Sequence, residues 1–159
     1  MNISSEKQHV VLLADDNVAD QRLFQRALLR HDPDIDLRVV SDGEEVMDYL
    51  KHRGPYRDPN TAPKPDLVLL DINMPRMDGK RTLREIREDH VLKGLPVVFM
   101  TTSDDGRDVR DSYELGVNAY LVKSPNIDEF FSAMETVVRF WLGVAWLPTK
   151  MRQMEKEQA

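Results

Sequence analysis

The chain has 159 residues, of which 41% are hydrophobic and 31% are charged, and its net charge is −6. This length fits one domain with a sizeable core. The acidic balance argues against a nucleic-acid-binding surface, which needs clustered Lys and Arg. There is no cysteine, which excludes disulfides, thiolate catalysis and thiolate metal sites.

The N-terminal segment MNISSEKQ is polar and lacks the apolar core of a signal peptide. The apolar runs further along the chain are of strand length, whereas a membrane span needs about 20 apolar residues. We therefore expect a cytoplasmic protein with no membrane partner and a flexible N-terminus over residues 1–8.

Short apolar runs alternate with amphipathic stretches of helical length. Most of the runs are rich in Val and Leu without polar alternation, which is typical of strands buried on both faces. The runs are residues 10–14, 37–40, 67–70, 97–100 and 119–122, and the helical stretches contain residues 23–28, 46–50, 83–86, 109–115 and 130–141. This alternation predicts a doubly wound α/β fold, with a five-stranded parallel sheet and helices on both faces.

Local signals mark where helices begin and where a long loop lies. Ser41 with Glu44, and Asn126 with Glu129, have the spacing of a capping box and predict two helix starts. Residues 54–65 (GPYRDPNTAPKP) contain four prolines, which predicts a loop before the third strand. The polar stretch 149–159 is expected to be frayed or to extend a helix.

Polar residues of one chemical kind follow four of the five predicted strands. In an open parallel sheet, ligands bind beyond the carboxyl ends of the strands. Taken alone, each of these residues has an ordinary explanation, as a helix cap, a strand threonine or a solvated lysine. They are Asp15 and Asp16 after the first strand, Asp71 after the third, Thr101 after the fourth and Lys123 after the fifth.

Carboxylates that converge at one edge repel each other unless a cation lies among them. Oxygen ligands without His or Cys favour Mg²⁺. A lysine and a hydroxyl at the same edge suit the oxygens of a phosphoryl group, and a carboxylate beside Mg²⁺ can attack phosphorus to give an acyl phosphate. The pattern therefore favours phosphoryl chemistry on an aspartate.

These motifs resemble the response-regulator receiver domains of two-component (phosphorelay) systems. The resemblance rests on Asp15-Asp16, on Asp71 in LVLLDINMPRMDG, on Thr101 in VVFMTTS and on Lys123 in NAYLVKSP. It implies a flavodoxin-like sheet with strand order 2-1-3-4-5, a receiver domain over residues 9–143 and a C-terminal extension over residues 144–159.

The resemblance also implies roles for individual residues. Asp71 is then the phosphoacceptor, and Mg²⁺ is held by Asp16, Asp71 and the backbone carbonyl of Asn73, with Asp15 acting partly through water. Lys123 pairs with the phosphoryl oxygens. Thr101 and Tyr120 form the switch, although Tyr120 could instead be a half-buried strand aromatic without that role.

Two features of the loops bear on this resemblance. Gly79, in the motif after Asp71, is expected to adopt a backbone angle that other residues disfavour. The chain reads Lys123-Ser124-Pro125, whereas most receivers place proline directly after the lysine. Whether the Lys123–Ser124 bond is cis therefore stays open, since such a bond is costly without proline.

The C-terminal extension carries more apolar residues than a finished receiver core needs. They either fold back on their own domain or form a self-complementary dimer contact, in which Trp and Phe are favoured. The candidate dimer residues are Phe140, Trp141, Leu142, Trp146 and Leu147. This tail, the Pro-rich loop and the Lys-Ser motif resemble the small single-domain response regulators of bacterial and cyanobacterial phytochromes. The implied partner is a red-light-sensing histidine kinase.

Two other functions compete with a signalling phosphoacceptor that is not an enzyme in its own right. One is an Mg²⁺-dependent phosphohydrolase, but such enzymes place an aspartate as general acid where this chain has Asn73. The other is a degenerate receiver that only docks a partner. Such a relic has no need of Asp71, Thr101 and Lys123.

Overall fold

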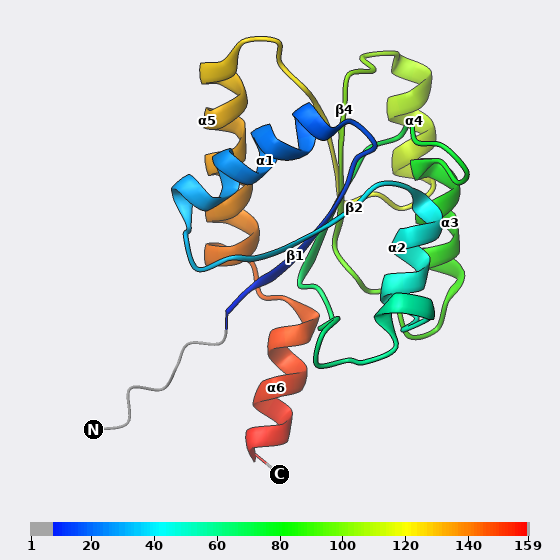
Figure 1. The fold of residues 1–159 in the computed structure, drawn as a ribbon, viewed down its shortest axis with the longest axis vertical. Helices are drawn as coiled ribbons and strands as arrows, with labels where there is room; N and C mark the ends of the chain where they lie inside the picture. The colour runs from blue at the N-terminus through cyan, green and yellow to red at the C-terminus, as the bar shows by residue number, and fades with distance from the viewer. Residues whose placement is uncertain (1–7, 159) are drawn as a thin grey trace.

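A computed structural model describes residues 8–158, so the predicted flexible N-terminus lies almost entirely outside the described residues. The strands form one parallel sheet of five strands in the order β2-β1-β3-β4-β5. The predicted doubly wound, flavodoxin-like α/β fold is therefore confirmed (Figure 1). The strands are β1 (Val10–Ala14), β2 (Asp36–Val40), β3 (Leu67–Leu70), β4 (Val97–Thr101) and β5 (Ala119–Val122).

Helices cover both faces of the sheet (Figure 1). Helices α1 (Val18–His31) and α5 (Ile127–Val137) lie on one face. On the other face lie α2 (Gly43–Leu50), α3 (Gly79–Glu88) and α4 (Gly106–Glu114). Central strands β1, β3 and β4 are buried throughout, but the edge strands β2 and β5 are largely half-buried. Burial on both faces was thus a correct prediction for the central strands only, because an edge strand has a neighbour on one side.

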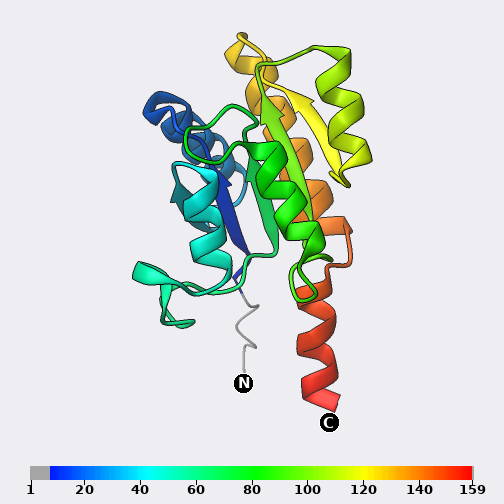
Figure 2. The same cartoon turned by 90° about the vertical axis from the view of Figure 1, so that its right-hand side faces the viewer.

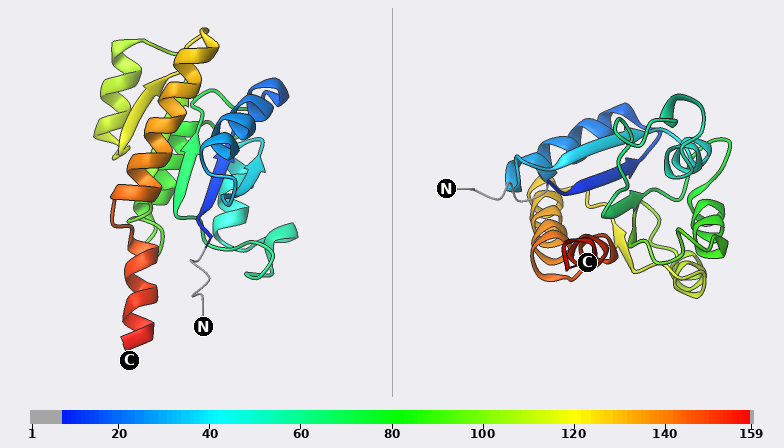
Figure 3. Two further views of the ribbon diagram at one scale, coloured as in Figure 1. Left: turned by 90° about the vertical axis from the view of Figure 1, so that its left-hand side faces the viewer. Right: turned by 90° about the horizontal axis from the view of Figure 1, so that it is seen from below.

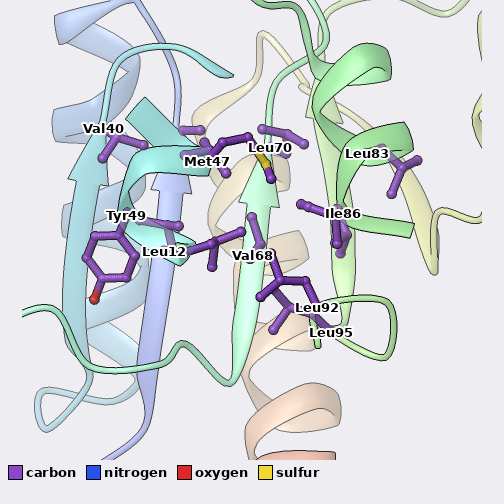
Figure 4. Packing of buried hydrophobic residues seen from close by; sticks show 14 of the residues in the cluster. Leu12, Val40, Met47, Tyr49, Val68, Leu70, Leu83, Ile86, Leu92 and Leu95 are labelled. Carbon is purple, nitrogen blue, oxygen red and sulfur yellow. The ribbon is translucent and has the colours of Figure 1, made fainter. Parts of the chain in front are cut away.

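The core is two layers of side chains that alternate along each strand. In β1, Leu12 packs with α2 and α3, and Leu13 packs with α1 and α5. Figure 4 shows the first layer, in which Leu12, Val68 and Met47 lie between the sheet and the helices. The continuous apolar runs follow from this arrangement, because each strand faces helices on both sides.

The start of α2 differs from the prediction. Its N-cap is Asp42, whose carboxylate accepts a hydrogen bond from the backbone N–H of Glu45 at 2.9 Å. The Glu45 carboxylate in turn accepts from the N–H of Ser41 at 3.2 Å. The predicted pair is therefore shifted by one residue, because Asp42 is also held by the guanidinium of Arg76. At α5, the predicted cap is confirmed, since Asn126 accepts from the N–H of Glu129 at 3.0 Å.

The proline-rich segment before β3 is mainly a loop, as predicted, but it begins with a 3₁₀ turn, η1 (Gly54–Tyr56), that the sequence did not reveal. Tyr49 of α2 and His52, which follows this helix, hold the rest of the loop. The hydroxyl of Tyr49 donates to the carbonyl of Pro63 at 2.7 Å, and the ring of His52 lies 2.9 Å from the carbonyl oxygen of Ala62.

The C-terminal extension is helical rather than frayed. Helix α5 continues through a π-helical segment, η2 (Val138–Val144), and α6 (Pro148–Gln158) then extends past the amino ends of the strands (Figures 2 and 3). Thr149 bonds to the carboxylate of Asp66, which also accepts from the N–H of Val10 at 2.8 Å. The start of α6 is thereby tied to the end of the sheet that lies opposite the carboxyl ends of the strands.

The helical stretch Ile127–Arg152 is long and apolar enough to cross a membrane by length and composition. Charged residues such as Glu135 and Arg139 interrupt this stretch, and residues 145–147 separate η2 from α6, so the stretch is not one continuous apolar run. Within this stretch, Phe130 and Met134 are buried against the sheet and α1, so packing in the core of the domain accounts for this part of its apolar character.

Candidate functional site

The register of the sheet brings the predicted site residues together. Ala14 pairs with Leu70 in adjacent strands, so the residues that follow, Asp15 and Asp71, leave the sheet side by side. The N–H of Asp71 donates to the carbonyl of Ala14 at 3.0 Å. On the other side, the N–H of Lys123 donates to the carbonyl of Thr101 at 2.7 Å.

Asp15, Asp16 and Asp71 form an acidic cluster. Each offers a carboxylate oxygen, and these oxygens lie within 4.8 Å of one another. Asp15 is only 1% exposed, whereas Asp16 is open to solvent. Burial raises the pKa of Asp15, although hydrogen bonds from Lys123 and from the N–H of Asn17 act in the opposite direction. The cluster is therefore costly to keep charged, and its oxygen ligands and open side fit a hard divalent cation.

Lys123 is the cation nearest to these carboxylates. Its ammonium nitrogen lies 2.7 Å from Asp15 Oδ2, 3.0 Å from Asp71 Oδ2 and 3.0 Å from Asp20 Oδ2. It also lies 5.5 Å from the centre of the Phe24 ring. Burial opposes its charge, but the bond to Asp15 and the charge of Asp71 outweigh burial and raise the pKa of Lys123. The lysine is thus held charged inside the site.

Thr101 and Tyr120 both contact the loop that joins β4 to α4. Thr101 is fully buried, and its hydroxyl accepts from the N–H of Ser103 at 3.3 Å. The hydroxyl of Tyr120 donates to the carbonyl of Ser103 at 2.8 Å. The side chain of Ser103 donates to Asp108 at 2.6 Å, and Lys80 of α3 contacts the same carboxylate. The two predicted switch residues therefore meet at one loop.

The start of α3 lies close to the backbone that directly follows β3. A Cβ on Gly79 would come within 2.8 Å of Ile72 Cα and still closer to the backbone oxygen of Asp71. Gly79 has no positive φ, so the expectation of an unusual backbone angle was wrong, and glycine is required by the close approach of the backbone. Asn73 lies exposed in the loop between β3 and α3, two residues after Asp71. Within residues 8–158 no peptide bond is cis, so Lys123–Ser124 is trans.

The C-terminal candidates divide into two groups. Phe140 and Trp146 are 50% and 74% exposed. Trp141 and Leu142 are half-buried against the α1–α5 layer of the core. Leu147 is 2% exposed and packs within its own chain, which argues against its predicted part in a dimer contact. Some of the predicted dimer residues therefore pack on their own domain, while neighbouring ones are exposed on its surface.

Asp20 is the site residue that the sequence did not reveal. It lies in the first turn of α1, where an acidic residue is explained by the helix dipole alone. Its contact with Lys123 joins residues 103 apart in the chain. An acidic residue one turn after the aspartate pair was the available signal, but it did not distinguish this contact from an ordinary helix start.

The sheet is doubly wound, and a carboxylate cluster and a lysine lie beyond the carboxyl ends of its strands. This arrangement defines an α/β protein with a site for a cation and an anionic group. Residues 11–135 match the family model described as the response regulator receiver domain. The chain therefore belongs to the response regulator receiver family, as its motifs predicted. Its function is that of a response regulator in two-component signalling, for which the family implies phosphorylation on an aspartate.

Individual relatives agree with this assignment. The response regulator Rcp1 of Synechocystis sp. is 40% identical over 148 residues, which cover 93% of this chain and 99% of that protein. The phosphorylated cyanobacterial phytochrome response regulator RcpA superposes with a TM-score of 0.84 at 41% identity, covering 89% of this chain and 99% of that one. The resemblance to phytochrome response regulators is thereby confirmed.

A metal-bound relative bears on the acidic cluster. The Mn²⁺-bound form of Rcp1 superposes with a TM-score of 0.80 at 41% identity, covering 88% of this chain and 99% of that one. Together with the oxygen ligands of Asp15, Asp16 and Asp71, this relative indicates a divalent-cation site.

Proposed function

We propose that this response regulator accepts a phosphoryl group on Asp71 from the phosphohistidine of a sensor histidine kinase. The observation that carries this proposal is the combination of contacts at Asp71. Asp15 also contacts Lys123, but it is 1% exposed, and Asp16 is exposed but has no bond to Lys123. Asp71 belongs to the acidic cluster, contacts Lys123 at 3.0 Å and keeps 12% of its side chain exposed. It is therefore the carboxylate that an incoming phosphoryl group can reach beside a cation.

The chemistry follows from these neighbours. A carboxylate oxygen of Asp71 attacks phosphorus, an O–P bond forms, and the bond between phosphorus and the donor breaks with its electron pair leaving on the donor. Asp16, Asp71 and the backbone carbonyl of Asn73 would hold Mg²⁺ at the cluster, with Asp15 acting partly through water. When bound, Mg²⁺ offsets the negative charge of the transferring group. Lys123 adds a charge-assisted hydrogen bond to the phosphoryl oxygens.

Phosphorylation then changes the loop between β4 and α4. The buried Thr101 hydroxyl, which now accepts from Ser103, turns to hydrogen-bond the phosphoryl group. Tyr120 gives up its bond to the carbonyl of Ser103 and rotates inward. The two rearrangements bias the surface of α4, β5 and α5 between two states.

The role is signalling rather than turnover of a substrate. Membership of the receiver family favours it over the phosphohydrolase, and the presence of Asp71, Thr101 and Lys123 favours it over the docking relic. The receiver domain spans residues 9–143, and residues 144–159 form the extension. The protein acts in the cytoplasm, with neither nucleic acid nor membrane as partner.

Two partners are proposed, one from the similar structures and one from the C-terminal extension. A phytochrome histidine kinase is proposed because RcpA, a similar structure over most of this chain, is a phytochrome response regulator. A homodimer through the extension is supported by the exposed aromatic rings of Phe140 and Trp146, with Trp141 and Leu142 at its border.

Intact mass spectrometry after incubation with Mg²⁺ and acetyl phosphate tests the phosphoacceptor. The wild type is expected to gain one phosphoryl group that hydroxylamine removes, and Asp71→Asn is expected to gain none while remaining folded. Phosphorylation of the Asp71→Asn protein at the same level would refute the assignment. If neither protein reacts, transfer from a phosphorylated phytochrome kinase decides the matter, and failure there refutes the proposal.

A further inference from the structure

The ammonium group of Lys123 has a third carboxylate partner, which comes from a helix and not from a strand end. Asp20 lies in the first turn of α1, and its Oδ2 is 3.0 Å from Lys123 Nζ. The Asp20 side chain is 36% exposed, whereas that of Lys123 is 9% exposed. Asp20 is therefore the partner of the Lys123 ammonium group that lies toward solvent.

The contacts of Lys123 match its hydrogen-bonding capacity. An ammonium group has three N–H donors, and each finds one carboxylate, from Asp15, Asp71 and Asp20. Asp15 and Asp71 also belong to the acidic cluster, so a divalent cation there shares their charge with the lysine. Asp20 is outside that cluster, and Lys123 is the only cation within ion-pair distance of it among the described residues.

Phosphorylation changes one of these contacts and leaves the others. When Asp71 attacks the phosphorus of acetyl phosphate, the new O–P bond forms, acetate leaves with the electron pair of the broken bond, and the Asp71 carboxylate loses its charge. The N–H that pointed to Asp71 then turns to a phosphoryl oxygen. Asp15 and Asp20 keep the other two N–H groups throughout.

We propose that Asp20 is a positioning residue that, together with Asp15, holds the Lys123 ammonium in place for phosphoryl transfer. The part that concerns transfer rests on the proposed function. A simpler explanation of Asp20 is its favourable position near the positive end of the α1 dipole. Asp128 also lies in the first turn of its helix, α5, one residue nearer the N-cap than Asp20 is in α1. It is exposed and has no lysine contact among the described residues, so it provides a control for the dipole effect.

The experiment compares Asp20→Ala, Asp20→Glu and Asp128→Ala with the wild type. NMR of the Lys123 side chain in protein labelled on lysine is recorded without metal, with Lys123→Arg identifying its signal. Because three carboxylates hold the group, its ammonium signal is expected to be visible in the wild type and in Asp128→Ala. Faster proton exchange is expected to remove it in Asp20→Ala, and Asp20→Glu is expected to restore it.

The second measurement is the rate of phosphorylation by acetyl phosphate at saturating Mg²⁺. Asp20→Ala is expected to slow it about tenfold, as expected for the loss of one hydrogen bond to a charged group, and Asp20→Glu is expected to recover much of the rate. An unchanged lysine signal in Asp20→Ala, or a rate equal to that of Asp128→Ala, overturns the proposal. If the wild type takes no phosphoryl group from acetyl phosphate, transfer from a phosphorylated kinase decides the proposed function, and the lysine signal alone decides the role of Asp20.

Discussion

Replacing Gly79 by alanine is expected both to destabilise the protein and to displace the backbone of Asp71. Gly79 begins α3, and its N–H donates to the carbonyl of Ile72 at 2.7 Å. An added Cβ would lie 2.8 Å from Ile72 Cα, about 0.6 Å inside the 3.4 Å at which ordinary contacts begin, and closer still to the backbone oxygen of Asp71. The atoms that must move are backbone atoms of Asp71 and Ile72, directly after β3, so no flexible side chain can relieve the contact.

The magnitude follows from this geometry. Overpacking a well-packed site costs about 1–3 kcal/mol, and a backbone clash places Gly79→Ala at the upper end of that range. For a domain of this size, such a loss lowers the melting temperature by roughly 4–12 °C. Because the displaced backbone carries Asp71, phosphorylation by acetyl phosphate should slow as well.

Urea denaturation of Gly79→Ala and Gly94→Ala provides the assay. A Cβ on Gly94 meets nothing within 4 Å, so this variant should stay within about 0.5 kcal/mol of the wild type. If Gly79→Ala were as stable as Gly94→Ala, the close approach of the backbone could not be the reason for glycine. A Gly79→Ala protein that is destabilised but phosphorylated at the normal rate would refute the link to Asp71.

Three further predictions concern the lysine, the β4–α4 loop and the tail. Lys123→Ala leaves the buried Asp15 without its cation, so the free energy of unfolding should fall by about 3–5 kcal/mol in a chelator. The loss should be smaller in Mg²⁺, and urea denaturation in the two buffers would measure both values. Equal losses would contradict a shared cation site. Hydrogen bonds from Lys80 and Ser103 lower the pKa of Asp108 below 3.8, so the carboxylate stabilises the fold above that value and this contribution disappears as the pH falls through the lowered pKa. Asp108→Asn should therefore be about 1 kcal/mol less stable at pH 7 and equal to the wild type in strong acid, and a difference that is independent of pH would refute this. Trp146→Ala should shift a dimer toward monomer in sedimentation without loss of stability. Leu147→Ala should lower the free energy of unfolding by about 2–5 kcal/mol because Leu147 is buried. A dimer that depends on Leu147, or a fold that depends on Trp146, would contradict these roles.

Much of the fold could be predicted from local pattern. The apolar runs around Leu12, Leu69 and Val98 lie in strands with helices on both sides, and such strands need no polar face. The start of α2 could not be assigned, because Ser41 and Asp42 are both good caps and the choice depends on Arg76, 34 residues further along the chain. The predicted helical stretch 130–141 correctly runs from α5 into η2, but the break at residues 145–147 before α6 was missed, because helix ends depend on packing as well as on composition.

The members of the phosphoryl site that follow strand ends could be predicted from the amino-acid pattern alone. In a parallel sheet every carboxyl end meets the same edge, so Asp15, Asp71 and Lys123 had to converge whatever the details of packing. The remaining contacts of the site depend on packing between distant parts of the chain. The approach of Asp20 to Lys123 and the crowding at Gly79 are contacts between backbones and side chains brought together by the sheet and its helices. The contrast between the buried Leu147 and the exposed Trp146 arises in the same way, because burial depends on the three-dimensional neighbours of a residue and not on its type.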